Sequence, residues 1–446
     1  METMTIIRRS LPSLLAPGLI VLATAVVVAV PHDTSVSTAH SSYPSVVCPG
    51  ALRSATASIS LPTTKVQIRS IKPGSTALHI SKKLRFPATA FPTFVTGSPG
   101  SIIVSEKISV TSVAATSCSV GSGDEWFIGG SAGVSNQGVL QVVNSGLSDS
   151  TVQIFPFSTH GPLAPITVVI KPNSDRIIPL AALAPGEESM AIHMVTQSGR
   201  VTSFLLDHRK RGLDEIGSSF VVPEEKAKTQ TFLGPVRAST SKKSKSSVTL
   251  RFLVPGDFDA QVHVTIHTAT SSFTPLGLDI RKIGHQKVVD VKLPQMTISS
   301  AYGIEIGSDQ PVFASALWKT ANDFAWTSAL APITKFQANL AGARAVFAFM
   351  GPDIRINAQW IGASGKRQKM MVVGQGERVW SPTGVINQLQ LTAIPVKKNA
   401  KSGEIYGGAI LDDGGISSIG LQGPTLTQSS LRPISDLRVL THVDRP

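Results

Sequence analysis

One short motif in this sequence has the spacing that could hold a nucleophilic serine. Gly-Gly-Ser-Ala-Gly at residues 129–133 fits the Gly-x-Ser-x-Gly pattern, which exposes a serine at a sharp turn between a strand and a helix. A strand can precede Ser131, but the sequence at residues 134–138, Val-Ser-Asn-Gln-Gly, favours a turn over a helix. Because such matches arise easily in a Gly- and Ser-rich chain, we expect Ser131 to be non-catalytic.

Two histidines have a spacing that would suit zinc on a helix. His263 and His267 lie four residues apart, but the sequence around them alternates as a strand does. On a strand they share a face about 13 Å apart, at roughly 3.3 Å per residue, which is too far to bind one ion. We therefore expect solvent-facing strand histidines.

Two aspartate pairs, Asp257 with Asp259 and Asp412 with Asp413, could supply oxygen ligands to calcium. Neither stretch has the run of alternating oxygen donors that a dedicated calcium loop provides. Aspartates in turns more commonly accept hydrogen bonds from their own backbone, and this is what we expect of both pairs. The sequence predicts no metal site, no cofactor and no catalytic residue.

The two cysteines, Cys48 and Cys118, are expected to form a disulfide. An exported protein with two cysteines most simply closes one bridge. A loop of about 70 residues would let the bridge contribute roughly 4 kcal/mol through the unfolded state. The alternative is a pair of unpaired buried thiols.

Basic side chains recur in short clusters across the chain. Formal net charge is +13, which favours polyanionic surroundings such as anionic lipid, cell-wall polymer or nucleic acid. The clusters lie at residues 82–85, 208–211, 242–245, 366–369 and 397–398. Each alone suggests a solvated loop, whereas five together on an exported protein make contact with an anionic envelope plausible. The tryptophans, which could stack on sugars, are expected to fill cores; they are Trp126, Trp318, Trp326, Trp360 and Trp380.

The elements that would position these residues are organised by an internal repeat. The pattern of residues 140–206 recurs, in degenerate form, at residues 250–317. Leu140, Gly146 and Val152 each have a counterpart 110 residues later. The alternating apolar residues predict that each copy forms a separate sandwich with the same strand order, and that Gly146 and Gly256 occupy equivalent turns.

Composition and patterning predict an all-β chain. Charged residues make up only 15%, and 37 Gly and 29 Pro suit short strands joined by many turns. A third, degenerate copy is expected from about residue 344, with a hairpin turn at residues 412–415. The prediction is a set of tandem immunoglobulin-like β-sandwich units. Their ranges are 41–130 for an N-terminal β region with the disulfide, 131–222 for repeat 1, 230–330 for repeat 2 and 335–446 for repeat 3. Residues 207–247 are interpreted as a linker with a connecting strand.

The N-terminus predicts export. Arg8 and Arg9 precede an uncharged apolar run at residues 11–30, which is long enough to cross a membrane as a transmembrane helix. Residues 1–40 are thus interpreted as a cytoplasmic stub and signal anchor, with the rest of the chain outside the cell membrane. A small-residue site near Ala39 leaves open a cleaved signal and a secreted protein. Either outcome makes nucleic acid an improbable partner.

Several short motifs resemble one family. They are the apolar N-terminal segment, Cys48-Pro49, and Cys118 followed by Trp-Phe-Ile-Gly-Gly at residues 126–130. A degraded Leu-x-Leu-x-Asn-Pro-Gly strand and turn follows at residues 140–146 and again at residues 254–256. In these features the chain resembles exported actinobacterial proteins of domain-of-unknown-function family 5719. The resemblance implies a fold and a location but no activity.

These observations lead to a non-enzymatic, membrane-anchored envelope protein. Its β-sandwiches would act as a binding or scaffolding module toward cell-wall polymer or other envelope proteins. One alternative is an accessory subunit of an envelope transport or glycan-assembly machine. The other alternative is an exported hydrolase. The sequence contains no evident grouping of nucleophile, base and acid that would favour the hydrolase.

Overall fold

The computed structural model describes residues 39–53, 56–237, 246–296, 298, 301–321, 323–394, 404–424 and 427–430. By contacts the chain divides into two units, of which Tyr43–Leu426 is the larger. In the smaller unit, β1 (Ala39–Ser42) pairs antiparallel with β32 (Thr427–Ser430). The predicted transmembrane helix at residues 11–30 lies outside the described residues. Among those described, no helix is long and apolar enough to span a membrane.

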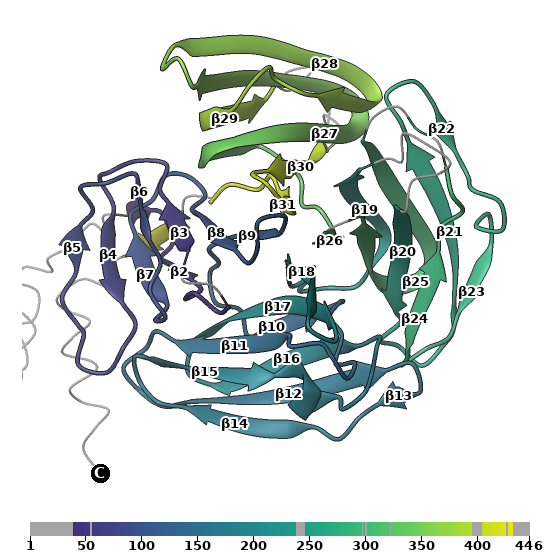
Figure 1. The fold of residues 1–446 in the computed structure, drawn as a ribbon, viewed down its shortest axis with the longest axis horizontal. Helices are drawn as coiled ribbons and strands as arrows, with labels where there is room; N and C mark the ends of the chain where they lie inside the picture. The colour runs from purple at the N-terminus through teal and green to yellow at the C-terminus, as the bar shows by residue number, and fades with distance from the viewer. Residues whose placement is uncertain are drawn as a thin grey trace, which may run out of the picture. The chain divides into compact units, whose positions relative to one another are not determined.

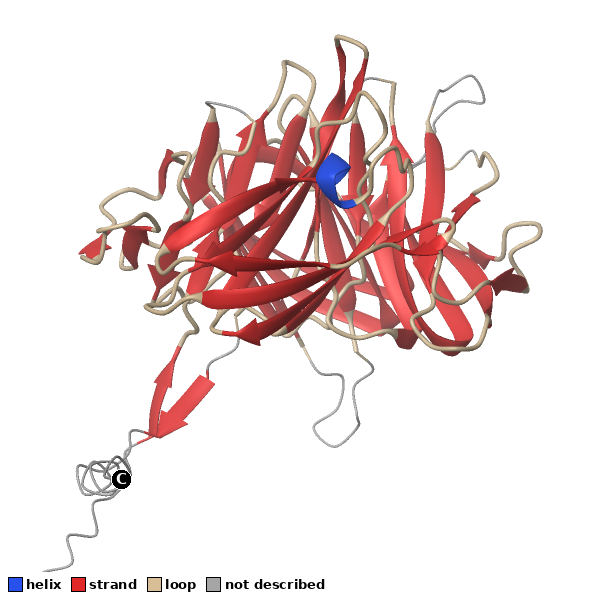
Figure 2. Ribbon diagram, turned by 90° about the horizontal axis from the view of Figure 1, so that it is seen from below, coloured by secondary structure: helices blue, strands red, loops and turns tan. Residues whose placement is uncertain are grey.

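The predicted all-β class is confirmed. In the described chain the only helix is the single turn α2 (Leu180–Leu183), drawn in blue in Figure 2, and every other regular element is a strand. Within Tyr43–Leu426 the strands form four β-sandwiches, here called A, B, C and D in chain order (Figure 1).

Sandwiches A and B each contain two antiparallel sheets, here called inner and outer. In A, the inner sheet has the order β6 (Arg85–Pro87), β3 (Ala57–Ser60), β8 (Ile103–Lys107), β9 (Val113–Ser117), and the outer sheet β2 (Val46–Cys48), β7 (Thr93–Thr96), β4 (Gln67–Ser70), β5 (His79–Ile80). In B, the inner sheet is β15 (Ser174–Pro179), β11 (Val139–Asn144), β17 (Val201–Arg211), β18 (Asp214–Val221), and the outer sheet β10 (Asp124–Phe127), β16 (Ala191–Ser198), β12 (Ser150–Ser158), with β13 (Gly161–Pro162) and β14 (Ile166–Ile170) beside β12.

Sandwiches C and D repeat this order, with some strands running through both sheets. In C, the inner sheet is β24 (Val288–Lys292), β20 (Ser247–Leu253), β25 (Tyr302–Lys319), β26 (Phe324–Thr327), and the outer sheet β19 (Lys228–Val236), β25, β21 (Ala260–His267), with β22 (Ser272–Phe273) and β23 (Arg281–Ile283) beside β21. In D, β27 (Lys335–Gly362) and β28 (Arg367–Trp380) serve both sheets and are joined by β29 (Ile386–Ala393), β30 (Tyr406–Asp412) and β31 (Ile416–Gly420).

The strand order is therefore the same in all four sandwiches, although only the second and third are evidently alike in sequence. In the outer sheets, the first strand of each sandwich pairs with a late strand: β2 with β7, β10 with β16, β19 with β25, and the start of β27 with β29. In the inner sheets, the second strand pairs with the next-to-last: β3 with β8, β11 with β17, β20 with β25, and the middle of β27 with β30. An immunoglobulin constant-type domain instead places its first strand beside its second.

Apolar alternation fills the cores as the repeat predicts. Leu140 and Val152 in sandwich B, and Leu250 and Val262 in sandwich C, are at most 1% exposed. Burying a side chain of this size stabilises a fold by about 1.5–3 kcal/mol. The glycine turns also correspond, because Gly146 connects β11 to β12 and its counterpart in C connects β20 to β21.

The predicted linker at residues 207–247 is wrong in its first part. Residues 201–221 form the hairpin of β17 and β18, in which the polar side chains of Asp207, His208 and Arg209 are buried. Arg209 Nε donates to Asp207 Oδ2 at 2.9 Å, and His208 Nε2 lies 3.2 Å from Glu215 Oε2. From sequence alone, residues 207–211 resemble a solvated loop because they are highly charged. Composition cannot show that these charges pair with one another and are buried.

The innermost strands of the four sandwiches meet around one axis. In Figure 1 these strands, β9, β18, β26 and β31, lie at the centre, and each contacts the next. Their small hydroxyl side chains link neighbours: Ser417 Oγ bonds to Val113 O, Ser219 Oγ accepts from Trp326 N at 2.9 Å, and Ser418 Oγ lies 3.1 Å from Thr327 Oγ1. We call these four strands the central ring.

Asp323 connects two strands of the central ring at the end where these strands begin. Asp323 Oδ1 accepts from Phe324 N and Asp323 Oδ2 from Ile416 N, both at 2.9 Å. Gly217 packs directly against the carboxylate, at a φ of +146°. Burial raises the pKa of Asp323 to about 7 despite these bonds.

Candidate functional site

The serine motif does not form a nucleophile site in the described structure. Ser131 is fully buried in a loop with no helix after it. Its Oγ lies 3.1 Å from Glu188 Oε2 and accepts from Asn136 Nδ2 at 2.6 Å, and none of the hydrogen bonds found for it in the described chain involves a histidine. Gly133 lies against the Glu188 carboxylate, where a larger residue would collide. The motif anchors a loop.

The two strand histidines have different neighbours. His267 Nε2 lies 2.8 Å from Glu305 Oε2, whereas the ring of His263 covers Gly307. No group of three or more His, Cys, Asp or Glu side chains in the described part of the chain is placed to hold a metal.

The aspartates have structural partners. Asp259 Oδ1 accepts from the backbone N of His285 at 2.9 Å, and Asp259 also pairs with Lys282 at 3.0 Å. Asp257 accepts from a glutamine side chain at 3.1 Å. Asp412 pairs with Arg237 at 3.2 Å.

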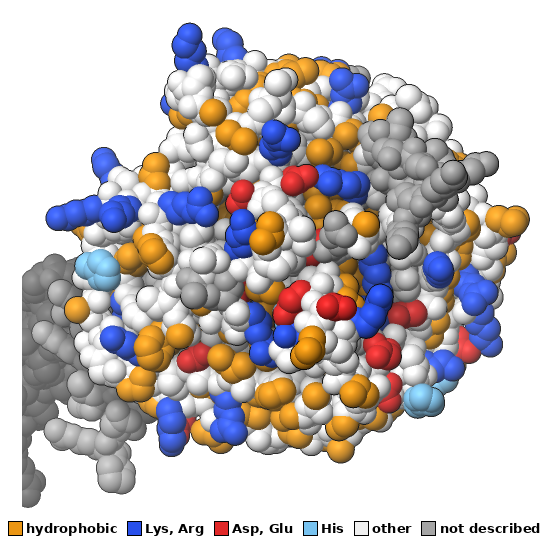
Figure 3. All heavy atoms as spheres, in the orientation of Figure 1, with side chains coloured by type: hydrophobic (Ala, Val, Ile, Leu, Met, Phe, Trp, Pro, Cys, Tyr) orange, Lys and Arg blue, Asp and Glu red, His pale blue; other side chains and the backbone are white. Residues whose placement is uncertain are grey.

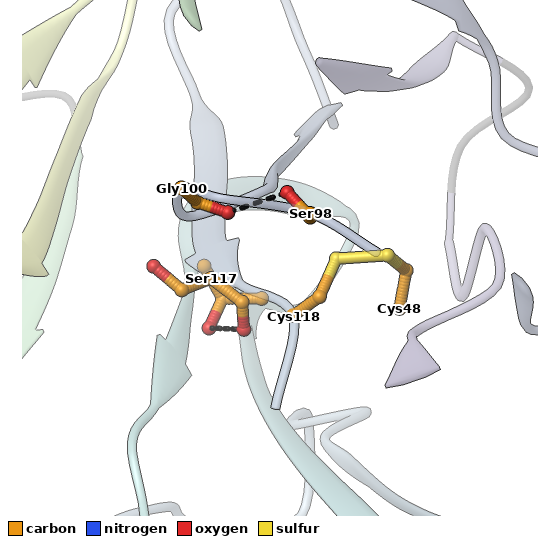
Figure 4. Close-up of a disulfide and its surroundings, with 6 residues drawn as sticks. Cys48, Ser98, Gly100, Ser117 and Cys118 are labelled. Carbon is orange, nitrogen blue, oxygen red and sulfur yellow. Dashed lines mark hydrogen bonds between the residues drawn. A yellow bond between two sulfur atoms is a disulfide. The ribbon is translucent and has the colours of Figure 1, made fainter. Parts of the chain in front are cut away.

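The predicted disulfide is present. Cys48 and Cys118 are bonded, with their Cα atoms 4.3 Å apart (Figure 4). The bridge joins the first strand of the outer sheet of A to the residue that follows ring strand β9. A backbone bridge between Val47 and Ser119 runs beside it, with N–O distances of 2.8 and 2.9 Å.

The basic clusters differ in exposure. Residues 208–211 are partly buried in the hairpin, which corrects the expectation of a solvated loop. Those at 82–85 and 366–369 are largely exposed on sandwiches A and D, where Figure 3 shows Lys and Arg side chains projecting. The clusters at 242–245 and 397–398 lie outside the described residues.

Four of the five tryptophans fill cores, as expected. The exception is Trp126, which is half-buried on β10. Its ring stacks on His193 at 3.8 Å and on Phe313 at 4.7 Å between ring centroids. Both faces of the Trp126 ring are thus covered by protein.

A cavity that sequence reasoning missed lies at the end of the central ring where its strands finish. It has a volume of about 480 Å³ and is lined from all four sandwiches. Eight of the lining residues carry hydroxyl groups beside a larger apolar part of the wall; they are Thr116, Ser117, Ser119, Ser122, Ser203, Thr327, Ser328 and Ser418. Ser328 Oγ is buried and has no hydrogen-bond partner within the described chain.

Two buried carboxyls, Glu125 and Glu224, also line this cavity. A backbone bridge positions both: Trp126 N donates to Glu224 O at 2.7 Å, and Glu224 N donates to Trp126 O at 2.8 Å. Ser203 Oγ bonds to Glu125 Oε2, and Ala329 N lies 3.4 Å from Glu224 Oε1. Neither carboxyl is in an ion pair in the described structure.

Burial controls the protonation of both groups. Loss of solvent raises the pKa of Glu224 to about 8 and that of Glu125 to about 7. At neutral pH Glu224 is therefore mainly a neutral acid, which can donate one hydrogen bond as well as accept. Glu225, Lys226 and Lys228 also line the cavity. Its hydroxyls and protonated carboxyls suit a neutral ligand with several hydroxyl groups.

The sequence did carry a weak signal for this site. Each ring strand is short and contains small or hydroxyl residues, as in Ala-Ala-Thr-Ser at 114–117 and Ser-Ser at 417–418. Glu125 and Glu224 look like ordinary surface acids, because only the Trp126–Glu224 bridge brings them to the same cavity.

The fold and site define an all-β protein of four like sandwiches closed around a central ring with a polar cavity at one end. A family model described as "Family of unknown function (DUF5719)" matches residues 96–375. The chain belongs to this family, as its motifs indicate.

Other comparisons add little. No curated protein matches the chain. One solved structure, "Crystal structure of tetra-tandem repeat in extending region of large adhesion protein", is 11% identical, with a TM-score of 0.12, over 87% of this chain and 99% of that one. Another, "Structure of infectious bursal disease virus Gx strain", is 10% identical, with a TM-score of 0.10, over 93% of this chain and 91% of that one. Neither carries an argument.

Proposed function

We propose that this chain is a non-enzymatic envelope protein, held at the cell membrane by residues 11–30, whose exported sandwiches bind a cell-wall polymer or another envelope protein. Of the immunoglobulin-like interpretation, we keep the two-sheet sandwich and not the strand order, because the first strand of each sandwich has a different partner. Its support is the uncharged N-terminal run, the disulfide, and a binding cavity at a rigid centre.

The central cavity is the proposed ligand site, and the observation that carries it is the pair Glu125 and Glu224. Uncharged carboxyls among hydroxyls pair well with sugar hydroxyls, because both partners can donate and accept. The ligand is therefore a neutral sugar unit of a wall glycan. Since four strands and a disulfide form the wall, the site requires little ordering when the ligand binds.

Calorimetric titration with soluble neutral wall-glycan fragments tests the cavity. Wild type and Glu224→Gln should bind alike, because the amide copies the neutral acid, and Glu224→Ala should bind roughly tenfold more weakly. Asp279→Asn, at an exposed position of sandwich C outside the cavity lining, is the control. Absence of binding by wild type, or equal binding by all variants, would contradict the assignment.

Location is tested separately. Protease added to intact protoplasts should degrade the region after residue 43, because Arg8 and Arg9 hold only the N-terminal end inside. Protection of that region would remove the basis for an envelope role. Pull-down from solubilised membranes then distinguishes a scaffold or accessory subunit from a polymer-binding protein.

A hydrolase remains the second candidate because of one observation. A carboxyl whose pKa lies near 7 or 8 can give or take a proton at neutral pH, and the cavity has two. Release of reducing ends from wall glycan, lost in both Glu224→Gln and Glu224→Ala, would favour this reading. Binding without release favours the first.

A further inference from the structure

A second candidate binding site lies along a groove between sandwiches A and D. Pro62, Leu84 and Arg85 of A face the outer sheet of D there. The groove has two sections, of about 100 and 390 Å³, which share the lining residues Ile361 and Gln388. The two sections therefore adjoin at these two residues.

The seam beside this groove is fixed by backbone contacts. Ser101 N donates to Gln337 O at 2.7 Å, and Gly100 packs so closely on the same carbonyl that a side chain there would collide. Ser101 Oγ donates to Gln422 O at 2.8 Å. The two walls therefore hold a set spacing.

Strand register brings amide side chains into rows on the D wall. Gln337 of β27 lies opposite Gln390 of β29, which lies opposite Gln359 of the returning part of β27, and Lys369 of β28 completes the row. Paired residues of a sheet share a face, so these four point the same way. The adjacent row contains, in order, Asn339, Gln388, Ile361 and Arg367.

The intervening residues explain why this face is outward. Phe336, Leu391 and Ala358 alternate with the amide row and are fully buried in the core of D. Period-two alternation thus leaves the amides on the opposite face, in the groove.

Four of these amides are available to a ligand. Gln337, Gln359, Gln388 and Gln390 are half-buried, and no side-chain hydrogen bond is found for any of them within the described residues. The amide of Asn144, by contrast, is satisfied within the protein, since its Nδ2 donates to Ser148 O at 2.7 Å and its Oδ1 accepts from Gly146 N at 2.8 Å. Each free amide offers two donors and an acceptor oxygen to hydroxyl groups.

The charge of the groove has one sign. Arg85 and Arg367 line it, Lys369 extends the amide row, and no Asp or Glu lies among the described lining residues. Arg85 uses Nε on Ser58 Oγ at 3.1 Å and one terminal nitrogen on Ala341 O at 3.3 Å, which leaves its other terminal nitrogen free of those contacts. Arg367 is exposed at the opposite end of its row.

We propose that this groove binds an anionic glycan strand. The amides would bond to its hydroxyls, while Arg85 and Arg367 would pair with its carboxylate or phosphate groups. Spacing supports a polymer over a small molecule, since neighbouring strands at about 4.8 Å place the amides in a line across three strands. The site is separate from the central cavity and holds whether or not the cavity binds a ligand.

The test uses the full exported region, immobilised, with polygalacturonate (carboxylate), poly(glycerol phosphate), neutral dextran and single-stranded DNA as probes. Wild type should bind at least one anionic carbohydrate-type polymer and bind dextran roughly tenfold more weakly. Which of the two anionic probes binds better identifies the charged group.

Variants locate the binding. Gln359→Leu with Gln390→Leu should weaken binding roughly tenfold, and Arg367→Gln should weaken it and flatten its salt dependence. Matched controls on sandwich C are Gln261→Leu and Arg281→Gln, both at exposed strand positions. Unchanged melting temperatures establish that the variants fold.

Three results would overturn the proposal. Equal losses in the groove and control variants would mean diffuse attraction to a +13 protein. If dextran bound as tightly as the anionic polymers, Arg85 and Arg367 would have no role in pairing with charged groups of the ligand. Preferred binding of DNA, lost in the groove variants, would replace the glycan with a nucleic acid.

Discussion

Glu224→Gln is expected to make the protein less sensitive to pH and more stable in mild alkali. Burial raises the pKa of this carboxyl from 4.5 to about 8, so the folded state holds the proton more tightly than the unfolded state does between those values. Stability from this group is complete below about pH 4.5 and is lost as pH rises through 8. Most acids behave in the opposite way, because folding usually lowers their pKa.

The size of the effect follows from the shift. Each pKa unit corresponds to about 1.4 kcal/mol, so Glu224 alone should cost the wild type roughly 3–4 kcal/mol between pH 5 and pH 8. Glu125 and Asp323, each with a pKa of about 7, and Glu377, at about 8, add to the trend in the same direction. The difference between wild type and Glu224→Gln isolates the one group.

Urea unfolding at pH 5, 6, 7 and 8, followed by the fluorescence of Trp326 and the other tryptophans, measures this difference. Trp326 lines the same cavity, so its signal reports local opening there. The amide of Gln can still accept from Ala329 N, which keeps packing constant. Parallel pH profiles for wild type and Glu224→Gln would refute the reasoning, as would an equal change in the control Asp279→Asn, which is exposed and outside the cavity lining.

Two further predictions concern the ring and its attachment. Replacing Cys48 and Cys118 together by serine should lower the free energy of unfolding by up to about 4 kcal/mol, measured by denaturation; an unchanged midpoint under oxidising conditions would contradict it. Gly217→Ala should cost about 2–4 kcal/mol, because the new methyl meets the Asp323 carboxylate at a φ that disfavours side chains. Gly256→Ala, in open space, is the control, and equal melting temperatures would disprove the strain.

The local alternation of apolar and polar residues predicted the all-β fold class and the repeat, but it did not predict the central ring. Leu140 and Leu250 lie on strands with equivalent neighbours. This could be predicted because alternation depends on residues close in the chain. The disulfide could also be inferred, from cysteine count and export. Asp207 and Arg209 were misjudged, since their burial depends on each other and on Trp326 Nε1, which donates to Asp207 at 2.7 Å.

The candidate site escaped prediction for the same reason. Glu125 precedes a tryptophan and Glu224 follows a proline, and neither position has a local feature that predicts burial. Their raised pKa values come from a cavity that exists only after all four sandwiches have assembled.

Closure of the ring gives the exported region a property that a string of sandwiches would lack. Ile103 and Ala115 of sandwich A belong to the same apolar core as Phe347 of sandwich D, so the first and last sandwiches are joined. Separate domains on linkers could unfold one at a time, whereas here each ring strand is held by its two neighbours. A substitution that destabilises the contact between two neighbouring sandwiches should therefore also disturb the central cavity. Both proposed binding sites depend on the contacts between sandwiches, which no single repeat contains.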